Sequence, residues 1–347
     1  MTSSTSNFEF NELETSPRNG GVFAVSVVIL LIFCIELTLW NTRQWFSDEA
    51  AWYWSEKQSL VDDGQMGAEV VFIGTSVTFH GIDTETLNEG LTPKNQFSNL
   101  SLNGLTLQYQ TQVLNEYIAS NGSPDEVVLE LRECCVTPQS WKTGPAWRFW
   151  MSNTELMESG FYFWKPGVIF DFYASRVLAS YAYRKSLDNW IFKSARLAGL
   201  SRAVFDRNGG ITNEMEESRG FAKGTFDAGL QEDPPKKSRP FKIDRSGQAW
   251  LNRLLETCRK NQIKVTIFSP PVPESVALDR LNAAYNNDYE KLISNLNSQY
   301  PELAIQVFKT SGYPLSCFAD DHHLSHAGAQ RVTKDFMTWW QHSTSRR

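Results

Sequence analysis

One long apolar run stands near the start of the chain, ahead of a much more mixed sequence. Residues 22–35 are almost wholly apolar, Glu36 interrupts the run, and apolar residues resume up to Trp40. The run is close to the roughly 20 residues that a membrane-spanning helix needs. Glu36 lies near its end, within reach of lipid headgroups, and tryptophan is enriched at that interface. We therefore expect a polar tail over residues 1–20 and an uncleaved transmembrane anchor over residues 21–40.

A cleaved signal peptide is the alternative to an anchor. No small-x-small cleavage site follows the run, and the polar segment before it is long, so the anchor is favoured. The flanking charges do not fix the orientation. Arg18 stands against three glutamates before the run, and Arg43 against two acidic residues after it, so the positive-inside rule gives no direction.

Beyond the anchor, patterns of buried strands alternate with patterns of amphipathic helices. Strand-like apolar runs occupy residues 69–73, 127–131, 264–268 and 304–308. Apolar residues at helical spacing occupy residues 107–118, 251–258 and 278–296. This alternation predicts an α/β domain with a parallel sheet covered by helices on both faces. We expect a spacer over residues 41–65 and the α/β domain over residues 66–136 and 246–341.

Residues 137–245 interrupt the alternation and are expected to be an insertion. Their first part is rich in tryptophan, tyrosine and phenylalanine. It is either a lid or wall of a binding site, suited to sugar rings, acyl chains or a membrane surface, or a helical subdomain with its own aromatic core. The later part, about residues 205–245, is polar and contains Asn208-Gly209-Gly210, which predicts a mobile loop.

Composition excludes some classes of function. The net charge of −6 argues against nucleic acid as a partner, because phosphate binding needs a basic surface. The five cysteines form no recognisable disulfide framework, although single pairings stay open, and no metal-ligand spacing appears. We expect neither a metal nor a cofactor.

Two short segments carry candidate chemistry. Gly74-Thr75-Ser76 directly follows the apolar run 69–73, so Ser76 is expected at the carboxyl end of a parallel strand, where open α/β sheets bind ligands. The glycine would let the backbone turn sharply and leave the next amides free for an oxyanion. Asp320-Asp321-His322-His323 precedes a predicted helix, with Ser325 as its possible N-cap and apolar positions from Ala329 to Trp340.

A serine hydroxyl needs an imidazole to take its proton and a carboxylate to orient that imidazole. His323 is the candidate base, and either Asp320 or Asp321 could fold back onto its Nδ1. Taken singly, the Gly-Thr-Ser segment is more often only a turn, and a histidine pair in a polar loop is usually solvated. Both segments in one α/β chain favour a catalytic interpretation. His80, four residues after Ser76, is expected to face solvent rather than the pocket.

At these residues the chain resembles the SGNH (GDSL-type) hydrolases. Gly74-Thr75-Ser76 is similar to their first block, with Thr75 where aspartate is commonest, and Asp320-Asp321-His322-His323 is similar to their closing Asp-x-x-His block. The resemblance covers residues 66–136 and 247–340. It implies a three-layer α/β/α flavodoxin-like fold, with Ser76 as nucleophile, His323 as base and Asp320 as its orienting acid.

The middle blocks of that family match less well. Residues 99–104, Asn-Leu-Ser-Leu-Asn-Gly, resemble the second block, which implies that Gly104, beside Asn103, supplies an oxyanion donor. The third block, Gly-x-Asn-Asp, is absent, and Glu130-Leu131-Arg132-Glu133 stands in its place. Arg132 either replaces the missing donor or binds an anionic group, or it merely pairs with a neighbouring glutamate.

The layout of an anchor, a spacer and then a Gly-x-Ser block followed by Gly81-Ile82-Asp83 resembles membrane-tethered SGNH proteins that modify cell-envelope polymers. It implies an extracytoplasmic esterase or O-acyltransferase acting on an envelope polysaccharide or glycan, with a membrane-bound acyl donor protein as a possible partner. A non-catalytic scaffold that binds a glycan or docks a membrane acyltransferase is the alternative, suggested by the missing third block.

Overall fold

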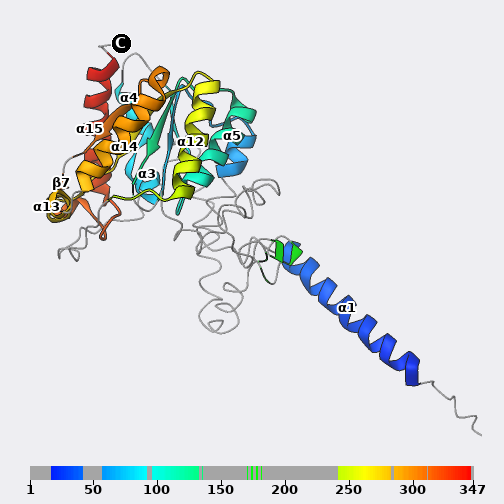
Figure 1. Cartoon of the computed structure of the whole chain (residues 1–347). Helices are drawn as coiled ribbons and strands as arrows, with labels where there is room; N and C mark the ends of the chain where they lie inside the picture. The colour runs from blue at the N-terminus through cyan, green and yellow to red at the C-terminus, as the bar shows by residue number, and fades with distance from the viewer. Residues whose placement is uncertain are drawn as a thin grey trace, which may run out of the picture.

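The computed structural model describes residues 17–41, 57–91, 96–132, 241–282, 285–310 and 312–344, together with position 135 and a few positions between 170 and 181. The first element is α1, Pro17–Asn41, a single long helix (Figure 1). Its stretch Gly21–Leu39 is apolar enough to cross a membrane, and none of it is buried against the rest of the chain. A signal sequence near the N-terminus passes the same test of length and apolarity.

The rest of the described chain is built on a parallel β-sheet. Its strands are β1 (Val70–Ile73), β2 (Phe97–Asn99), β3 (Glu126–Glu130), β4 (Lys264–Ser269) and β6 (Gln306–Lys309). They lie in the order β2-β1-β3-β4-β6, and every neighbouring pair is parallel. A separate two-stranded parallel pair joins β5 (Val272–Pro273) to β7 (Gly312–Tyr313).

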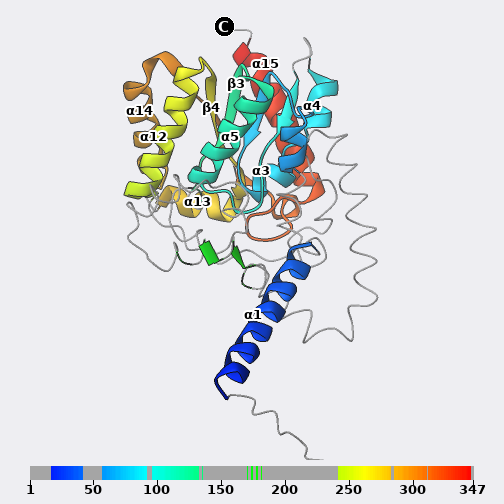
Figure 2. The same ribbon diagram turned by 90° about the vertical axis from the view of Figure 1, so that its right-hand side faces the viewer.

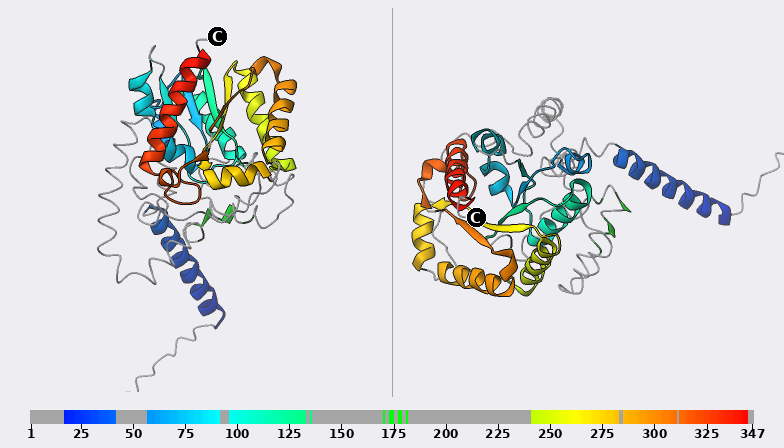
Figure 3. Two further views of the ribbon diagram at one scale, coloured as in Figure 1. Left: turned by 90° about the vertical axis from the view of Figure 1, so that its left-hand side faces the viewer. Right: turned by 90° about the horizontal axis from the view of Figure 1, so that it is seen from above.

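Helices cover both faces of this sheet, as the sequence predicts. The helices are α3 (Ser76–Gly81), α4 (Thr84–Gly90), α5 (Leu107–Asn121), α12 (Arg245–Lys260), α13 (Glu274–Asn282), α14 (Tyr285–Gln299) and α15 (His326–Thr344), with short 3-10 turns at Pro301–Leu303 (η3) and Leu315–Cys317 (η4). Figure 2 looks onto the face covered by α5 and α12, and Figure 3 shows α15 on the opposite side.

Two apolar clusters correspond to these two faces. Alternate strand residues such as Val71 and Val127 join the buried side chains of α5, α12 and α14 in one cluster. Their neighbours, such as Phe72 and Val128, join α15 in the other, where Phe336 packs edge-on against Phe72 at 5.0 Å between ring centroids. Successive side chains of a strand point to opposite faces, so strands buried on both sides read as continuous apolar runs.

Polar caps fix where several helices begin. The predicted N-cap Ser325 is confirmed at the start of α15, because its Oγ accepts a hydrogen bond from the amide of Gly328 at 3.3 Å. A side chain at Gly328 would overlap the carbonyl of Cys317, so glycine is required there by close approach. Asp83 of the Gly-Ile-Asp segment caps α4 by accepting from the amide of Thr86 at 3.1 Å.

The structure differs from the sequence prediction in three places. The apolar pattern over residues 278–296 divides between α13 and α14 instead of forming one helix. Residues 57–62, within the expected spacer, are helical, and Leu60 and Val61 are buried in the core. Strand β2 was not expected. The predicted aromatic insertion and polar loop, residues 137–245, lie almost wholly outside the described residues.

Candidate active site

Ser76 lies where β1 ends and α3 begins, as expected from the apolar run before it. Thr75 is the N-cap of α3, since its side chain accepts a hydrogen bond from the amide of Val77 at 3.3 Å. Ser76 is therefore the first helical residue, at the carboxyl end of a central strand. This edge of a parallel α/β sheet is where ligands bind.

Gly74 is needed for a reason other than the one the sequence suggested. Its backbone is not in the left-handed region, so no sharp glycine turn is required. A side chain at Gly74 would instead overlap the carboxylate of Glu130 and the hydroxyl of Thr78. The glycine therefore makes room for a buried acid close to Ser76.

Glu130, at the end of β3, holds the turn that carries Ser76. Its carboxylate accepts from the amide and the hydroxyl of Thr75, both at 2.7 Å, and from the hydroxyl of Thr78 at 2.6 Å. The Glu130 side chain is fully buried. A buried carboxylate with three such bonds is fully engaged, so this single side chain holds Thr75 and Thr78, on both sides of Ser76, to the end of β3.

The histidine comes from a closed loop before α15. A β-bridge pairs Phe318 with Leu324 across the loop, and the amide of Ala319 donates to the carbonyl of His323 at 2.8 Å. Within the loop, Oδ1 of Asp320 accepts from the amides of His322 and His323 at 2.9 and 2.7 Å. The aspartate thus organises the backbone that presents the imidazole.

The structure brings Ser76, His323 and Asp320 into one chain of hydrogen bonds. Oγ of Ser76 lies 2.8 Å from Nε2 of His323, and Nδ1 of His323 lies 2.6 Å from Oδ2 of Asp320. An ionised carboxylate only accepts, so the ring proton must sit on Nδ1. Nε2 is then left as the acceptor for the serine hydroxyl. This is the arrangement in which an imidazole can remove the proton of a nucleophilic serine.

The environment favours a charged acid and a neutral base. Partial burial raises the pKa of Asp320, but the hydrogen bonds from the His323 ring and from the two backbone amides outweigh it and bring the pKa down to about 2. Burial lowers the pKa of His323, and its bond to Asp320 only partly offsets this. At neutral pH the site therefore holds an aspartate and an unprotonated imidazole.

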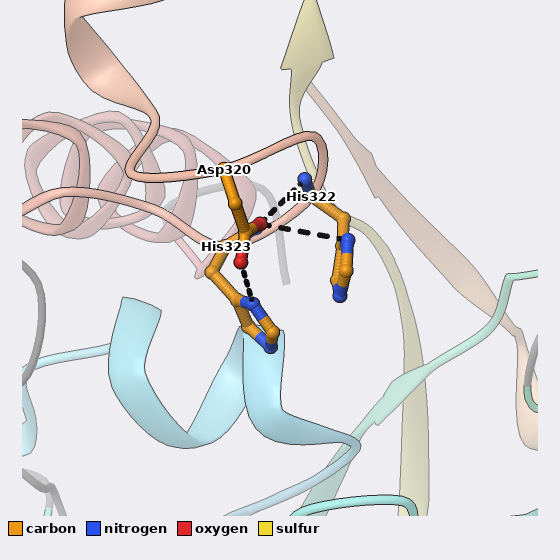
Figure 4. Close-up of side chains that lie close together, drawn as sticks. All are labelled: Asp320, His322 and His323. Carbon is orange, nitrogen blue, oxygen red and sulfur yellow. Dashed lines mark hydrogen bonds and ion pairs between the residues drawn. The ribbon is translucent and has the colours of Figure 1, made fainter. Parts of the chain in front are cut away.

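The second aspartate and histidine of the segment pair with each other. Nδ1 of His322 contacts a carboxylate oxygen of Asp321, and both side chains are largely exposed. Figure 4 shows the Asp320 carboxylate between the two histidine rings, with one oxygen toward each. Of the two aspartates left open by the sequence, Asp320 is the one that contacts Nδ1 of His323.

The same group has the ligand types of a divalent-cation site. One potential ligand atom each from Asp320, His322 and His323 lie within 4.8 Å of one another. Both nitrogens of His323 are already within hydrogen-bond distance of Oδ2 of Asp320 and Oγ of Ser76. A metal on Nδ1 would displace the proton that Asp320 holds there, so metal binding and the serine arrangement exclude each other.

Arg132 lies near the site and does what the plainer interpretation expected. Its Nε is 3.5 Å from a carboxylate oxygen of Glu130, which is the neighbouring glutamate considered from the sequence. The positive charge of Arg132 also contributes to the lowered pKa of His323. The guanidinium is therefore placed within electrostatic range of the imidazole, with 17% of its side-chain surface exposed.

The proposed oxyanion loop continues from β2 and is joined to the nucleophile turn. The amide of Leu102 donates to the carbonyl of Gly74 at 3.2 Å, two residues before Ser76. Gly104 follows with φ +75°, a conformation that favours glycine, and Asn103 stands beside it. The amide of Thr75 is occupied by Glu130, so one of the amides that the sequence left free is not available.

The expectation for His80 is wrong, and two polar residues were missed. His80 is buried, with its ring centroid 4.5 Å from that of Phe79, so it does not face solvent. The sequence assigned no role to Glu130 beyond a pairing with Arg132. It placed Lys57, which is also fully buried, in a spacer. Lys57 belongs to no apolar repeat. Glu130 interrupts the predicted apolar strand 127–131, and this polar position within a buried strand is the signal that could have drawn attention to it.

The comparisons with known proteins give little beyond this geometry. No protein-family model matches the chain, and no curated protein matches it. One solved structure with a similar arrangement is that of a "putative platelet activating factor" from Streptococcus pneumonia, at 13% sequence identity and a TM-score of 0.33. The match covers 92% of this chain and 98% of the other. A likeness at that TM-score does not bear on the function of this chain.

Proposed function

We propose that this protein is a membrane-anchored serine esterase or O-acyltransferase of SGNH type that handles O-acyl groups of an envelope polysaccharide or glycan. The observation that carries the proposal is the hydrogen-bonded series Ser76–His323–Asp320, in which Ser76 lies 247 positions before His323 in the sequence. The strand order β2-β1-β3-β4-β6 supports it, because it is the order of a flavodoxin-like sheet. The resemblance of Gly74-Thr75-Ser76 and of Asp320 to His323 to SGNH blocks points to the same class.

The chemistry follows from the geometry of the site. Oγ of Ser76 attacks the acyl carbonyl while Nε2 of His323 takes its proton. Asp320 keeps the imidazole in the right tautomer and stabilises the imidazolium that forms. The amides of Ser76 and Gly104 stabilise the oxyanion of the tetrahedral intermediate. His323 then gives the proton to the leaving oxygen, and an acyl-serine remains.

The second half of the reaction decides between esterase and transferase. His323 removes a proton from an acceptor hydroxyl, which attacks the acyl-serine and regenerates Ser76. Water as acceptor gives hydrolysis, and a sugar hydroxyl gives O-acylation. The apolar helix α1 supports the second, because a tether would hold the domain beside an acyl donor in the membrane and beside an envelope polymer outside it.

A non-catalytic SGNH-like scaffold is the second candidate. It is favoured by the absence of the third block, where Glu130 and Arg132 stand in place of an asparagine donor. In that case Glu130 would have only the structural task of holding the turn. The scaffold would bind a glycan or dock a membrane acyltransferase without forming an acyl-serine.

The test is covalent labelling of the detergent-solubilised full-length chain with a fluorophosphonate. Wild type is expected to be labelled at Ser76, and Ser76→Ala and His323→Ala are expected to abolish labelling. His326→Ala is the matched control, because His326 is an exposed histidine three positions after His323. Its labelling should equal that of wild type.

The other outcomes separate the alternatives. A folded wild type that takes up no label would favour the scaffold over the enzyme. Labelling that zinc abolishes and EDTA restores would show that Asp320, His322 and His323 bind a metal in competition with the serine arrangement. For a labelled wild type, hydrolysis of an acyl ester measured with and without a soluble oligosaccharide distinguishes water from a sugar as acceptor.

A further inference from the structure

Lys57 is a fully buried lysine that the proposed reaction does not use. It lies in the helical segment 57–62, before β1, and none of its surface is exposed. Nζ donates to the carbonyl of Asn99 at 2.7 Å and to the carbonyl of Ser101 at 2.6 Å. The same nitrogen lies 4.2 Å from the centre of the Phe79 ring, a favourable position for a cation.

These contacts join the two segments that form the proposed site. Asn99 is the last residue of β2, and Ser101 lies three positions before Gly104, whose amide is the proposed oxyanion donor. Phe79 is on α3, three positions after Ser76. One side chain therefore touches both the start of the oxyanion loop and the helix of the nucleophile.

The side chain of Asn99 strengthens the same junction. Its Nδ2 donates to the carbonyl of Thr78, on α3, at 3.0 Å. It also donates to the carbonyl of Ile82, just after that helix, at 3.2 Å. Its Oδ1 accepts from the amide of Ser101 at 3.0 Å. The loop is thus bound to α3 through the side chain of Asn99, and Lys57 holds the carbonyls of Asn99 and Ser101.

A buried amine is a costly way to fill space. Burial lowers the pKa of Lys57 well below its ordinary value, which shows how strongly the surroundings disfavour the charge. An apolar side chain of the same length would avoid this cost, but it would take away the donor that the two carbonyls share. The two hydrogen bonds to the carbonyls of Asn99 and Ser101, rather than the packing of its alkyl chain, therefore account for a lysine at this position.

We propose that Lys57 is a positioning residue that holds the loop from Leu100 to Gly104 against the nucleophile turn, so that the oxyanion geometry depends on the docking of the segment at residues 57–62. The proposal rests on the proposed function for its catalytic consequence, but not for its structural one. Fifteen residues, 42–56, separate Lys57 from the end of α1 at Asn41. Residues 57–62 thus follow α1 closely in the sequence. A change in how residues 57–62 dock would act on the oxyanion loop.

The test compares Lys57→Met with Tyr117→Phe in the full-length protein. Tyr117 is a matched control because it too is a buried side chain that bonds two backbone groups, the amide and carbonyl of Ala68, at the opposite end of β1. Hydrogen–deuterium exchange in peptides covering residues 97–106 should be about tenfold faster in Lys57→Met and unchanged in Tyr117→Phe. Fluorophosphonate labelling should slow by at least about tenfold in the first variant only.

The two readouts keep the proposals apart. Exchange in residues 97–106 measures the loop whether or not Ser76 reacts, so a wild type without labelling counts against the enzyme alone. Unchanged exchange in that peptide, or a rise spread equally over the chain, overturns the role of Lys57. Lys57→Gln, which keeps an N–H donor, should give an intermediate exchange rate. If neither variant folds, Lys57 is a determinant of the fold and the positioning role is rejected.

Discussion

The strongest consequence of the site geometry concerns Asp320→Asn. Oδ1 of Asp320 accepts two backbone amides, from His322 and His323, so the amide oxygen of an asparagine must take that place. Its NH₂ group is then forced to the position of Oδ2, facing Nδ1 of His323, where the carboxylate now lies at 2.6 Å. An NH₂ group only donates, so the ring proton moves to Nε2, and the base can no longer accept from Ser76.

The size of the effect can be separated from a loss of stability. The pKa of Asp320 falls from 3.8 to about 2, which corresponds to about 2 kcal/mol. The side chain is 43% exposed, so solvent screening reduces this to about 1 kcal/mol of folding stability. The inverted tautomer should cost on the order of a thousandfold to ten-thousandfold in the rate at Ser76, or about 4 to 5.5 kcal/mol. The loss of reactivity therefore exceeds the loss of stability.

The assay is the rate of fluorophosphonate labelling of folded protein, with urea unfolding measured on the same samples. Asp321→Asn is the matched control, since Asp321 contacts His322 and not His323. It should keep a rate within about threefold of wild type, as expected of an exposed ion pair. Equal losses in the two variants, or a folded Asp320→Asn protein that reacts as fast as wild type, would refute the assigned tautomer.

Three further predictions concern the buried acid Glu130, the pH dependence of labelling and the acid stability that Asp320 contributes. Glu130→Gln should destabilise the protein by about 1 to 3 kcal/mol in urea unfolding. The amide and the hydroxyl of Thr75 would lose the carboxylate as their acceptor, and an NH₂ group would face Arg132. A change below about 0.5 kcal/mol would show that the carboxylate does not hold the turn. The labelling rate should be constant above pH ~6.5 and fall only at lower pH, because burial lowers the pKa of His323 and the base must be neutral to act; a rate that still rises steeply between pH ~7 and ~8 would contradict a lowered pKa. Because the pKa of Asp320 is lowered, its carboxylate stabilises the folded protein above pH 3.8, and this stabilisation is lost as the pH falls toward about 2. Acid unfolding of wild type should therefore show a loss of stability over this range that Asp320→Asn does not show.

The local parts of the fold were readable from the sequence. The run before Ser76 forms β1, and the apolar stripe after Ser325 forms α15, because both depend on a repeat of adjacent side chains. Asp320 and His323 are only three positions apart, so their contact is also local in the sequence. Such periodic patterns predict which residues lie on one face of a strand or helix, and in β1 and α15 the structure confirms the prediction.

Single polar contacts between distant segments could not be read in the same way. Glu130 lies 55 positions from Thr75, and Lys57 lies 42 positions from Asn99, and neither pair leaves a repeat in the sequence. The same limit explains Gly74, whose need for glycine comes from a carboxylate on another strand. It also explains His80, whose burial depends on what the sheet and helices place over α3.

The closed loop around Asp320 has a consequence for the order in which the protein becomes reactive. Acid and base are neighbours in the chain, so this pair needs only its own loop, bridged by Phe318 and Leu324, to form. The serine is 247 residues earlier and meets the pair through one hydrogen bond. During synthesis Ser76 emerges long before His323, so in a nascent chain its hydroxyl has no imidazole beside it. Under the proposed function, Ser76 would gain its base only when the loop before α15 has docked beside β1, after nearly the whole chain has been made.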